Sequence, residues 1–280
     1  MTFMDLQEPC YAYMFGFLQM DGHLSGRSGH KGRLSVELAH RDIELLRHFQ
    51  RLTPYRSSVG TRTRSTNFAP RHTTALWTLC ALEARDRLEE LGLPYGRKST
   101  TVTPPQVPYA RRDYLRGVID ADGSVGRTSR GIPFLSLTTA STAIAITLRD
   151  YVRLVTGAER VLKRNTRDNI YNLLYTTECA VELAGHFYYS DCLALERKTR
   201  SAADAATWLR PANMRRSGPR RVWSAQEDRV LVASTGLEEA ALVLGRSVQS
   251  CAMRLWRFRN GSLPLPEGDV SPGFSANGRA

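Results

Sequence analysis

The chain has 280 residues, 42% of them hydrophobic and 24% charged, a composition typical of folded globular proteins. Its formal charge of +12 indicates a polyanionic partner, either nucleic acid or an anionic membrane surface. The sequence has no long apolar run, no basic-then-apolar start, no Cys-x-x-Cys pair and no P-loop. We therefore expect no membrane helix, secretory signal, zinc ribbon or P-loop nucleotide site.

The first 106 residues predict a small unit of helices and strands. Residues 11–20 are apolar enough for a buried helix, and Gly22 follows where glycine commonly forms a left-handed cap. Further along, period-two alternation predicts strands, and apolar residues at helical spacing predict helices. In chain order these elements are a strand at 34–38, a helix from 43 to 49, strands near 55–62 and 75–80, and a helix at 83–91.

Residues 107–200 repeat this unit. The helix predicted at 112–121 ends in Asp122-Gly123, 101 positions after Asp21-Gly22, so Gly123 is expected to be the second left-handed cap. A Leu-Ser pair at 34 and 135 and the basic Lys98 and Lys198 return at nearly the same offset. The other elements are a strand at 134–138, a helix after 141, strands near 160–164 and 170–176, and a helix at 179–188. The predicted fold class is α+β, with two pseudo-symmetric halves that each follow the order αββαββα.

The sequence changes character after residue 200. Residues 201–221 contain two prolines and a basic run and predict a linker that includes a short helix near 202–209. Residues 222–262 predict a compact unit of three helices: Ser224 and Glu227 fit a capping box, and further helices fit 237–244 and 247–259. Residues 263–280 are rich in Gly, Pro and Ser and predict a disordered tail.

The paired Asp-Gly helix ends point to a divalent cation. Small residues at Gly16, Gly117 and Ala121 would let the two helices pack closely. We call this helix–helix interface the seam, and the larger Met20 occupies its fourth position. Asp21 and Asp122 would then meet at one end, where two carboxylates repel unless a cation lies between them. Mg²⁺ suits aspartate oxygens, and the negative ends of both helix dipoles favour a cation. Such a site can support phosphodiester hydrolysis.

The second motif resembles the hallmark of the LAGLIDADG homing endonuclease family, through Leu115, Gly117, Ile119, Asp120, Ala121, Asp122 and Gly123. The first motif matches through Gly16, Asp21 and Gly22 and departs at Phe15, Gln19 and Met20. The resemblance covers residues 10–200. It implies a monomer whose two sheets straddle DNA, with two or three Mg²⁺ ions shared by Asp21 and Asp122. It also implies cleavage of both strands to leave short 3′ overhangs. Asp120 is expected to be structural, because Gln19 is its counterpart.

The family resemblance also implies a basic residue near each active site, and Lys98 and Lys198 are the repeat-matched candidates for this catalytic role. Alternatively, each lysine contacts the DNA backbone or packs against the preceding helix. DNA-binding residues are expected on strands and connecting loops, because Arg and Lys hold phosphates and read guanine edges. They are Arg27, Lys31, Arg33, Arg56, Arg62, Arg64 and Arg71 in the first half and Arg127, Arg130, Lys163, Arg164 and Arg167 in the second.

The C-terminal unit resembles a Myb/SANT-like helix-turn-helix domain, through Trp223, Leu231, Ala240-Ala241, Leu244, Leu255 and Trp256. Its third helix would be the recognition helix, with Arg254 and Arg257 directed at DNA. The alternative is a small helical bundle that docks a partner protein.

We therefore expect a homing-type, Mg²⁺-dependent, site-specific double-strand DNA endonuclease encoded by a mobile element. Its partner would be double-stranded DNA with a long pseudo-palindromic or asymmetric target, without a membrane. Its place would be the cytoplasm of a bacterial or phage-infected cell, in association with the nucleoid. One alternative is a non-catalytic, sequence-specific transcription regulator, which would be expected to have lost the motif carboxylates. A second alternative is an RNA-binding intron maturase.

Overall fold

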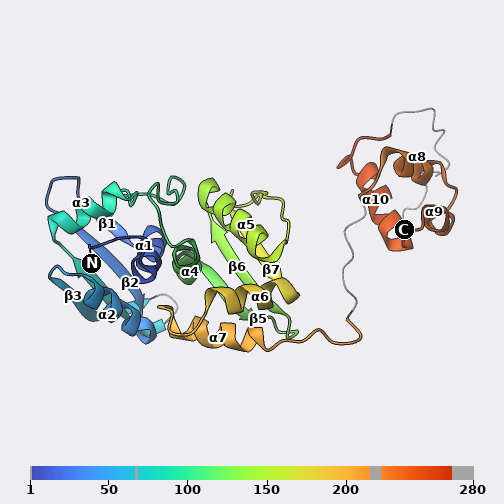
Figure 1. Ribbon diagram of the computed structural model, residues 1–280. Helices are drawn as coiled ribbons and strands as arrows, with labels where there is room; N and C mark the ends of the chain where they lie inside the picture. Colours follow the sequence, from blue (N-terminus) through green and yellow to red (C-terminus); the bar gives the residue numbers. More distant parts are fainter. Residues whose placement is uncertain (1, 67–68, 215–221, 267–280) are drawn as a thin grey trace. The chain divides into compact units, whose positions relative to one another are not determined.

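The computed structural model describes residues 2–66, 69–214 and 222–266 and divides the chain into two compact units between Pro211 and Ala212 (Figure 1). Each unit has its own hydrophobic core, so each is described by itself. Among the described residues, no helix has the length and apolar character needed to cross a membrane.

The first half of the larger unit packs three helices on one four-stranded sheet. Its elements are α1 (Pro9–Asp21), β1 (His23–Ser25), β2 (Arg33–Ala39), the 3-10 helix η1 (His40–Asp42), α2 (Ile43–Leu52), β3 (Ser57–Thr66), β4 (Ala69–Leu79) and α3 (Leu82–Glu90). The strands pair antiparallel in the order β1-β2-β4-β3. The alternation predicted for β2 places Leu34 and Val36 in the core, where Phe49 packs edge-on against Trp77.

The second half repeats this arrangement with one strand fewer. Its elements are α4 (Arg111–Asp122), β5 (Gly123–Arg127), β6 (Pro133–Thr139), α5 (Thr142–Thr156), β7 (Tyr171–Thr176), α6 (Thr177–Phe187) and α7 (Glu196–Ala206). The sheet is antiparallel in the order β5-β6-β7. Ser141 caps α5 as predicted, since its hydroxyl accepts a hydrogen bond from the Ile144 amide. In Figure 1, α1 and α4 lie side by side between the two sheets.

The strand predicted near 160–164 is wrong, so the second half does not follow αββαββα. In this described segment only an isolated bridge joins Arg164 to Tyr171. Side chains take the hydrogen bonds that a strand's backbone would make: the Arg160 guanidinium donates to Leu174 O on the free edge of β7, at 2.6 Å. The segment also follows Gly157, a left-handed residue that ends α5.

The left-handed glycine caps are also wrong. Gly22 and Gly123 have φ angles of −71° and −110°, so both are extended and lead straight into β1 and β5. The two positions require glycine for a different reason, because a larger side chain would not fit there. An added Cβ would lie 2.5 Å from Leu18 O at Gly22 and 2.5 Å from Ser136 O at Gly123.

The linker predicted at 201–221 begins too early, and the second half does not end at residue 200. Helix α7 continues to Ala206, and the larger unit extends to Pro211. The reason is burial: Ala202 and Ala205 pack with Val125 and Ala184 in a small apolar cluster beside the sheet. The basic run within 215–221 lies outside the described residues.

The smaller unit consists of α8 (Ala225–Ala233), α9 (Leu237–Leu244) and α10 (Val248–Arg259). The predicted capping box is present, because Ser224 accepts from the Glu227 amide while the Glu227 carboxylate accepts from the Ser224 amide. Leu231, Leu244, Cys251, Leu255 and Phe258 form the core. Of the predicted tail, residues 267–280 lie outside the described residues.

Candidate functional site

The two helices that carry the motifs, α1 and α4, contact each other at glycines. An added Cβ at Gly117 would lie 2.1 Å from Tyr13 O, and one at Gly16 would lie 2.2 Å from Tyr114 O. Backbone therefore packs directly against backbone, which no larger residue allows. The other two expected seam residues, Met20 and Ala121, are partly buried against the core. This contact places the C-terminal ends of α1 and α4 side by side.

Two reciprocal hydrogen bonds cross the seam. The Tyr13 hydroxyl on α1 donates to Asp120 Oδ2 on α4 at 2.7 Å, and the Tyr114 hydroxyl on α4 donates to Gln19 Oε1 on α1 at 2.6 Å. Tyr13 and Tyr114, like Gln19 and Asp120, lie 101 positions apart in the sequence. The two helices are therefore related by an approximate two-fold axis. The two hydrogen bonds fix the register of one helix against the other.

Gln19 and Asp120 differ because they face different partners. The Gln19 amide also donates to Gly92 O and Thr103 O, both at 2.9 Å. Asp120 instead accepts from the Tyr188 hydroxyl and the Leu195 amide, both at 2.7 Å. The amide of Gln19 donates to carbonyl groups, whereas the carboxylate of Asp120 accepts from donors. Each side chain therefore suits the groups that surround it in its own half. Asp120, 1% exposed, is a structural residue in this arrangement.

Lys98 and Lys198 cap the two motif helices. Lys98 Nζ donates to Leu18 O, Gln19 O and Met20 O at 3.3, 2.6 and 2.6 Å. Lys198 Nζ donates to Ile119 O, Asp120 O and Gly123 O, each at 2.7 Å. Three bonds use all the protons of an ammonium group, and burial lowers the pKa of both lysines to about 8. The negative helix ends that we expected to attract a metal ion are thus already met by lysines.

Asp21 and Asp122 are exposed residues at these helix ends. Desolvation by the surrounding protein and the charge of Asp122 raise the pKa of Asp21 from 3.8 to about 6, and Lys98, Lys198 and Arg197 oppose the shift. Desolvation also raises the pKa of Asp122, against the same two lysines. The two carboxylates therefore share one electrostatic environment, in which both being ionised without a cation costs free energy.

A cavity of about 270 Å³ adjoins Asp122 and is lined by Met20, Ser99, Thr138 and Thr139, among others. It opens beside the helix ends. Among the described residues, no group of three or more His, Cys, Asp or Glu side chains could enclose a metal ion. A cation bound here would have two carboxylates from the chain and would need its other ligands from water or substrate.

Two arginines next to the lysines were not among the predicted site residues. Arg97 and Arg197 precede Lys98 and Lys198 and are exposed, whereas the lysines are buried. Arg197 forms a salt bridge with Asp42 at 3.1 Å and lowers the pKa of Asp21. Their repeat-matched positions beside the lysines were the available signal.

The expected DNA-binding residues of the first half are all exposed. Arg27 and Lys31 lie in the turn between β1 and β2, which buried Arg85 anchors by donating to His30 O at 2.8 Å. Arg33, Arg62 and Arg64 point away from the core on β2 and β3, and Arg64 pairs with Glu37 at 3.3 Å. Arg56 precedes β3, and Arg71 lies on β4.

In the second half, two of the five expected DNA-binding residues are hydrogen-bonded within the protein. Arg127 donates to Asp204 O and the Thr207 hydroxyl at 2.6 and 2.7 Å, which holds α7 against β5. Arg164 donates to Ala140 O and the Thr142 hydroxyl at 3.0 Å and stacks on Tyr171. Arg130 and Lys163 are exposed in loops, as is Arg167, which pairs with Asp168.

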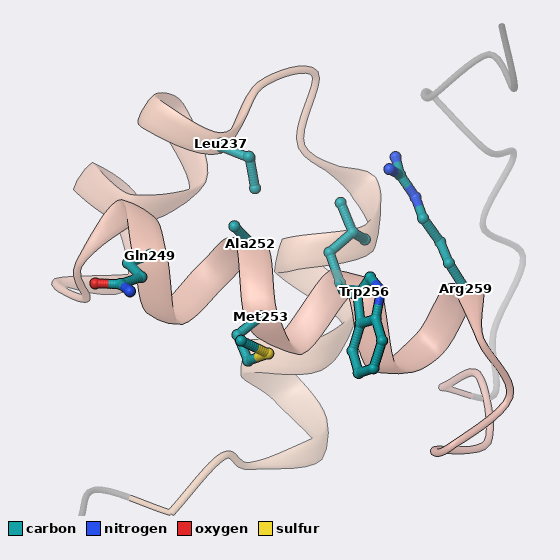
Figure 2. A pocket seen from close by; sticks show the side chains of 7 residues that line it. Leu237, Gln249, Ala252, Met253, Trp256 and Arg259 are labelled. Atoms are coloured by element: carbon teal, nitrogen blue, oxygen red, sulfur yellow. The ribbon is translucent and has the colours of Figure 1, made fainter. Parts of the chain in front are cut away.

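On the third helix of the smaller unit, Arg254 points inward, contrary to expectation, and Arg257 is exposed. Arg254 donates two hydrogen bonds to buried Asp228, at 2.8 and 2.6 Å, and lies over Trp223 and Phe258. Figure 2 shows Gln249, Met253 and Trp256 along α10 beside Leu237, at a largely apolar pocket of about 480 Å³. The Trp256 side chain is 57% exposed.

Comparisons with known proteins give one family match. Residues 110–186 match the family described as LAGLIDADG-like domain. No curated protein matches the chain by sequence. The solved structures it resembles include the meganuclease I-SmaMI bound to uncleavable DNA, at 13% identity and a TM-score of 0.48, covering 71% of this chain and 87% of that one.

Two further solved structures show a comparable likeness. The homing endonuclease I-WcaI bound to its DNA recognition sequence is 13% identical, with a TM-score of 0.49 and coverage of 70% of this chain and 87% of that one. The N-terminal LAGLIDADG domain of DUF199/WhiA is also 13% identical, with a TM-score of 0.43 and coverage of 70% and 89%. Residues 110–186, which include the Asp122-Gly123 motif on α4, are therefore similar to the LAGLIDADG-like domain family.

Proposed function

We propose that the chain is a site-specific double-strand DNA endonuclease that requires Mg²⁺ and leaves short 3′ overhangs. The observation that carries this proposal is the pairing of Asp21 and Asp122 at the ends of two helices related by an approximate two-fold axis. The two strands of duplex DNA are related by similar two-fold symmetry. A pseudo-symmetric pair of carboxylates therefore suits one cut in each strand.

The residues present fit a hard divalent cation. Desolvation and the charge of Asp122 raise the pKa of Asp21, so both carboxylates are ionised at neutral pH most easily when they share a cation. Asp21 and Asp122 would hold two or three Mg²⁺ ions, and phosphate oxygens and water would complete their coordination. Bound Mg²⁺ supplies Lewis-acid activation of water and neutralises charge on the phosphate.

The remaining residues of the site position the carboxylates and the phosphate. Since Lys98 and Lys198 donate all their protons to backbone carbonyls, we assign them to holding the helix ends that carry the aspartates. Arg97 and Arg197 are exposed beside them, and Arg197 lies within electrostatic range of Asp21. We assign to these arginines the charge stabilisation of the scissile phosphates.

In this proposal, DNA lies on the larger unit, whose exposed arginines and lysines include Arg33, Arg62, Arg130 and Lys163. The formal charge of +12 supports this partner. The smaller unit adds affinity through α10, which exposes Gln249, Trp256 and Arg257. We further propose that the enzyme acts as a monomer, within the cytoplasm and on nucleoid DNA.

The test is a cleavage assay on a pooled library of randomised duplexes, with Mg²⁺ or with EDTA, for the wild type and Asp122→Asn. We expect Mg²⁺-dependent cuts with short 3′ overhangs that the variant does not make. Specific binding of duplex DNA without any cut would contradict the nuclease and identify a non-catalytic regulator. Specific binding of structured RNA alone would identify a maturase.

A further inference from the structure

The face of the second sheet that points away from the core carries no charged side chain in any of its fully described strands. We call the outward faces of the two sheets their open faces. Antiparallel register places this open face in three cross-strand rows. The rows are Asn172 and Thr138; Leu174, Ser136 and Ser124; and Thr176, Phe134 and Gly126. Leu174 is 45% exposed, whereas the alternate residues Leu135, Leu137 and Leu173 are buried.

The open face of the first sheet is ionic by contrast. On β2, Arg33 and Glu37 alternate with buried Leu34 and Val36. On the β3–β4 pair, Arg62 lies opposite Thr74, and Arg64 lies opposite His72. The two sheets correspond by repeat and by antiparallel pairing, although the second has one strand fewer, and the side chains of their open faces differ in chemistry.

The second half does carry charged side chains, but they lie around its sheet and not on its open face. Arg130 is in the turn between β5 and β6, and Lys163 and Arg167 are in the segment between α5 and β7. The Arg160 guanidinium lies at the free edge of β7, bonded to Leu174 O. Cations around an uncharged face suit phosphates at its rim and base edges at its centre.

The edges of the four bases present different chemical groups to such a face. In the major groove, arginine pairs best with guanine, whereas apolar side chains contact the C5-methyl group of thymine. The Thr138 hydroxyl donates to Asn172 Oδ1 at 3.0 Å, which fixes the orientation of the amide and leaves both Nδ2 protons of Asn172 to donate to acceptors such as thymine O4. Leu174, in the adjacent row, is an exposed apolar side chain.

Building on the proposed DNA-binding function, we propose that the two halves read half-sites of different chemistry. The second sheet recognises an A·T-rich half-site through thymine methyl groups, with Leu174 as the specificity-determining residue. The first sheet reads its half-site through arginine contacts to guanine, with Arg62 on the edge strand β3 as the arginine that contacts guanine. The preferred target is therefore asymmetric in base composition.

The test removes only the methyl group. A target is selected from randomised duplexes by binding to the full chain in EDTA, and thymine is then replaced by deoxyuridine in one half-site at a time. The half-site under each sheet is assigned by repeating the selection with Leu174→Ala and with Arg62→Ala. We expect each replaced thymine at the second sheet to weaken binding about fourfold, the effect of removing one buried methyl group. Deoxyuridine in the other half-site should have little effect.

Leu174→Ala should bind the thymine and deoxyuridine targets equally, because the contact is already gone. Leu154→Ala is the matched control, since Leu154 is 76% exposed on α5 and remote from the open face. It should keep the wild-type preference. Equal sensitivity to deoxyuridine in both half-sites, or a methyl preference retained by Leu174→Ala, would overturn the inference while leaving the nuclease proposal intact. Failure to select any duplex would overturn the proposed function itself and the inference with it.

Discussion

At the residue scale, buried polar groups hold the exposed aspartates in place. Lys198 is 4% exposed, and its ammonium group is bonded to three carbonyls at the end of α4. It also lies close enough to Asp120 for that carboxylate to raise its pKa, against the larger effect of desolvation. The lysine thus satisfies a helix end and balances a buried carboxylate at once.

Replacing this lysine should destabilise the larger unit. In Lys198→Met, three carbonyls lose their donor and Asp120 loses a nearby cation, so we expect a loss of about 3 kcal/mol in the free energy of unfolding. Urea denaturation measures this loss. The control Lys163→Met alters an exposed lysine and should change stability by less than about 0.5 kcal/mol. Equal stability of both variants would show that the capping bonds contribute nothing.

The raised pKa of Asp21 predicts how stability depends on pH. Folding raises this pKa from 3.8 to about 6, so the stabilisation it gives is present below pH 3.8 and is lost as the pH rises through about 6. Asp21→Asn stays neutral and lacks this loss. At pH 8 in EDTA we expect the variant to be more stable than the wild type by roughly 1 kcal/mol, a value reduced for solvent exposure. That corresponds to about 2–4 °C in Tm.

Differential scanning fluorimetry at pH 4 and pH 8 checks this prediction. The two proteins should melt together at pH 4 and separate at pH 8, and Mg²⁺ should raise the Tm of the wild type more than that of the variant. A wild type that is more stable than Asp21→Asn at pH 8 in EDTA would contradict the assigned electrostatics.

The pairing of the two aspartates could be predicted because the repeat is visible in the chain. The bonds from the lysines to backbone carbonyls could not be predicted, since no sequence pattern records which carbonyls a fold leaves unpaired. The inward turn of Arg254 was accessible in principle. It lies three residues after Cys251 and four before Phe258, on the buried stripe of α10.

At the element scale, the crossing of α1 and α4 sets the geometry of the site. The contact depends on the lack of a side chain at Gly16 and Gly117. Neither glycine has a positive φ, so space and not backbone conformation requires them.

Gly117→Ala should therefore be strongly destabilising. Its Cβ would lie 2.1 Å from Tyr13 O, a backbone atom that moves only if the helices separate. We expect a loss of about 3 kcal/mol or more in the free energy of unfolding, together with loss of cleavage. The matched control is Gly185→Ala in α6, where the added Cβ meets nothing within 4 Å. It should be neutral or stabilising by about 0.5–1 kcal/mol. Similar effects at the two glycines, read from chemical denaturation, would exclude the close crossing.

Most elements were predictable because burial imposes a clear period on the sequence, as in β2 and α9. The strand expected at 160–164 failed because its neighbours are polar and its arginine side chains replace backbone bonds. The end of helix α7 was assigned to the linker because its buried apolar residues, Ala202 and Ala205, give little hydrophobic signal. A buried alanine can be recognised from the sequence only when the surface against which it packs is known.

At the scale of the whole molecule, two compact units share a net positive charge of 12. The larger unit holds the paired aspartates, and the smaller holds the exposed Trp256 and Arg257 of α10. Their separate cores indicate that the larger unit folds without the smaller one.

A chain ending at Pro211 should therefore still cut DNA with Mg²⁺ but bind more weakly. We expect at least about tenfold lower affinity near 0.15 M salt, with a shallower dependence of log K on log salt, because fewer phosphates are neutralised. Fluorescence anisotropy across a salt series measures both quantities. Trp256→Ala in the full chain should reproduce part of the loss. Unchanged affinity on truncation would assign the smaller unit to a protein partner.

The most direct test of the account is strand cleavage on the selected target by the wild type, Asp21→Asn, Asp122→Asn and the double variant, each at saturating protein. Denaturing gels report each strand separately. The wild type should cut both strands with Mg²⁺ and neither strand in EDTA. Each single variant should lose at least about a thousandfold in cutting rate while still binding the target. Cutting at the wild-type rate by either single variant would contradict the paired-aspartate site.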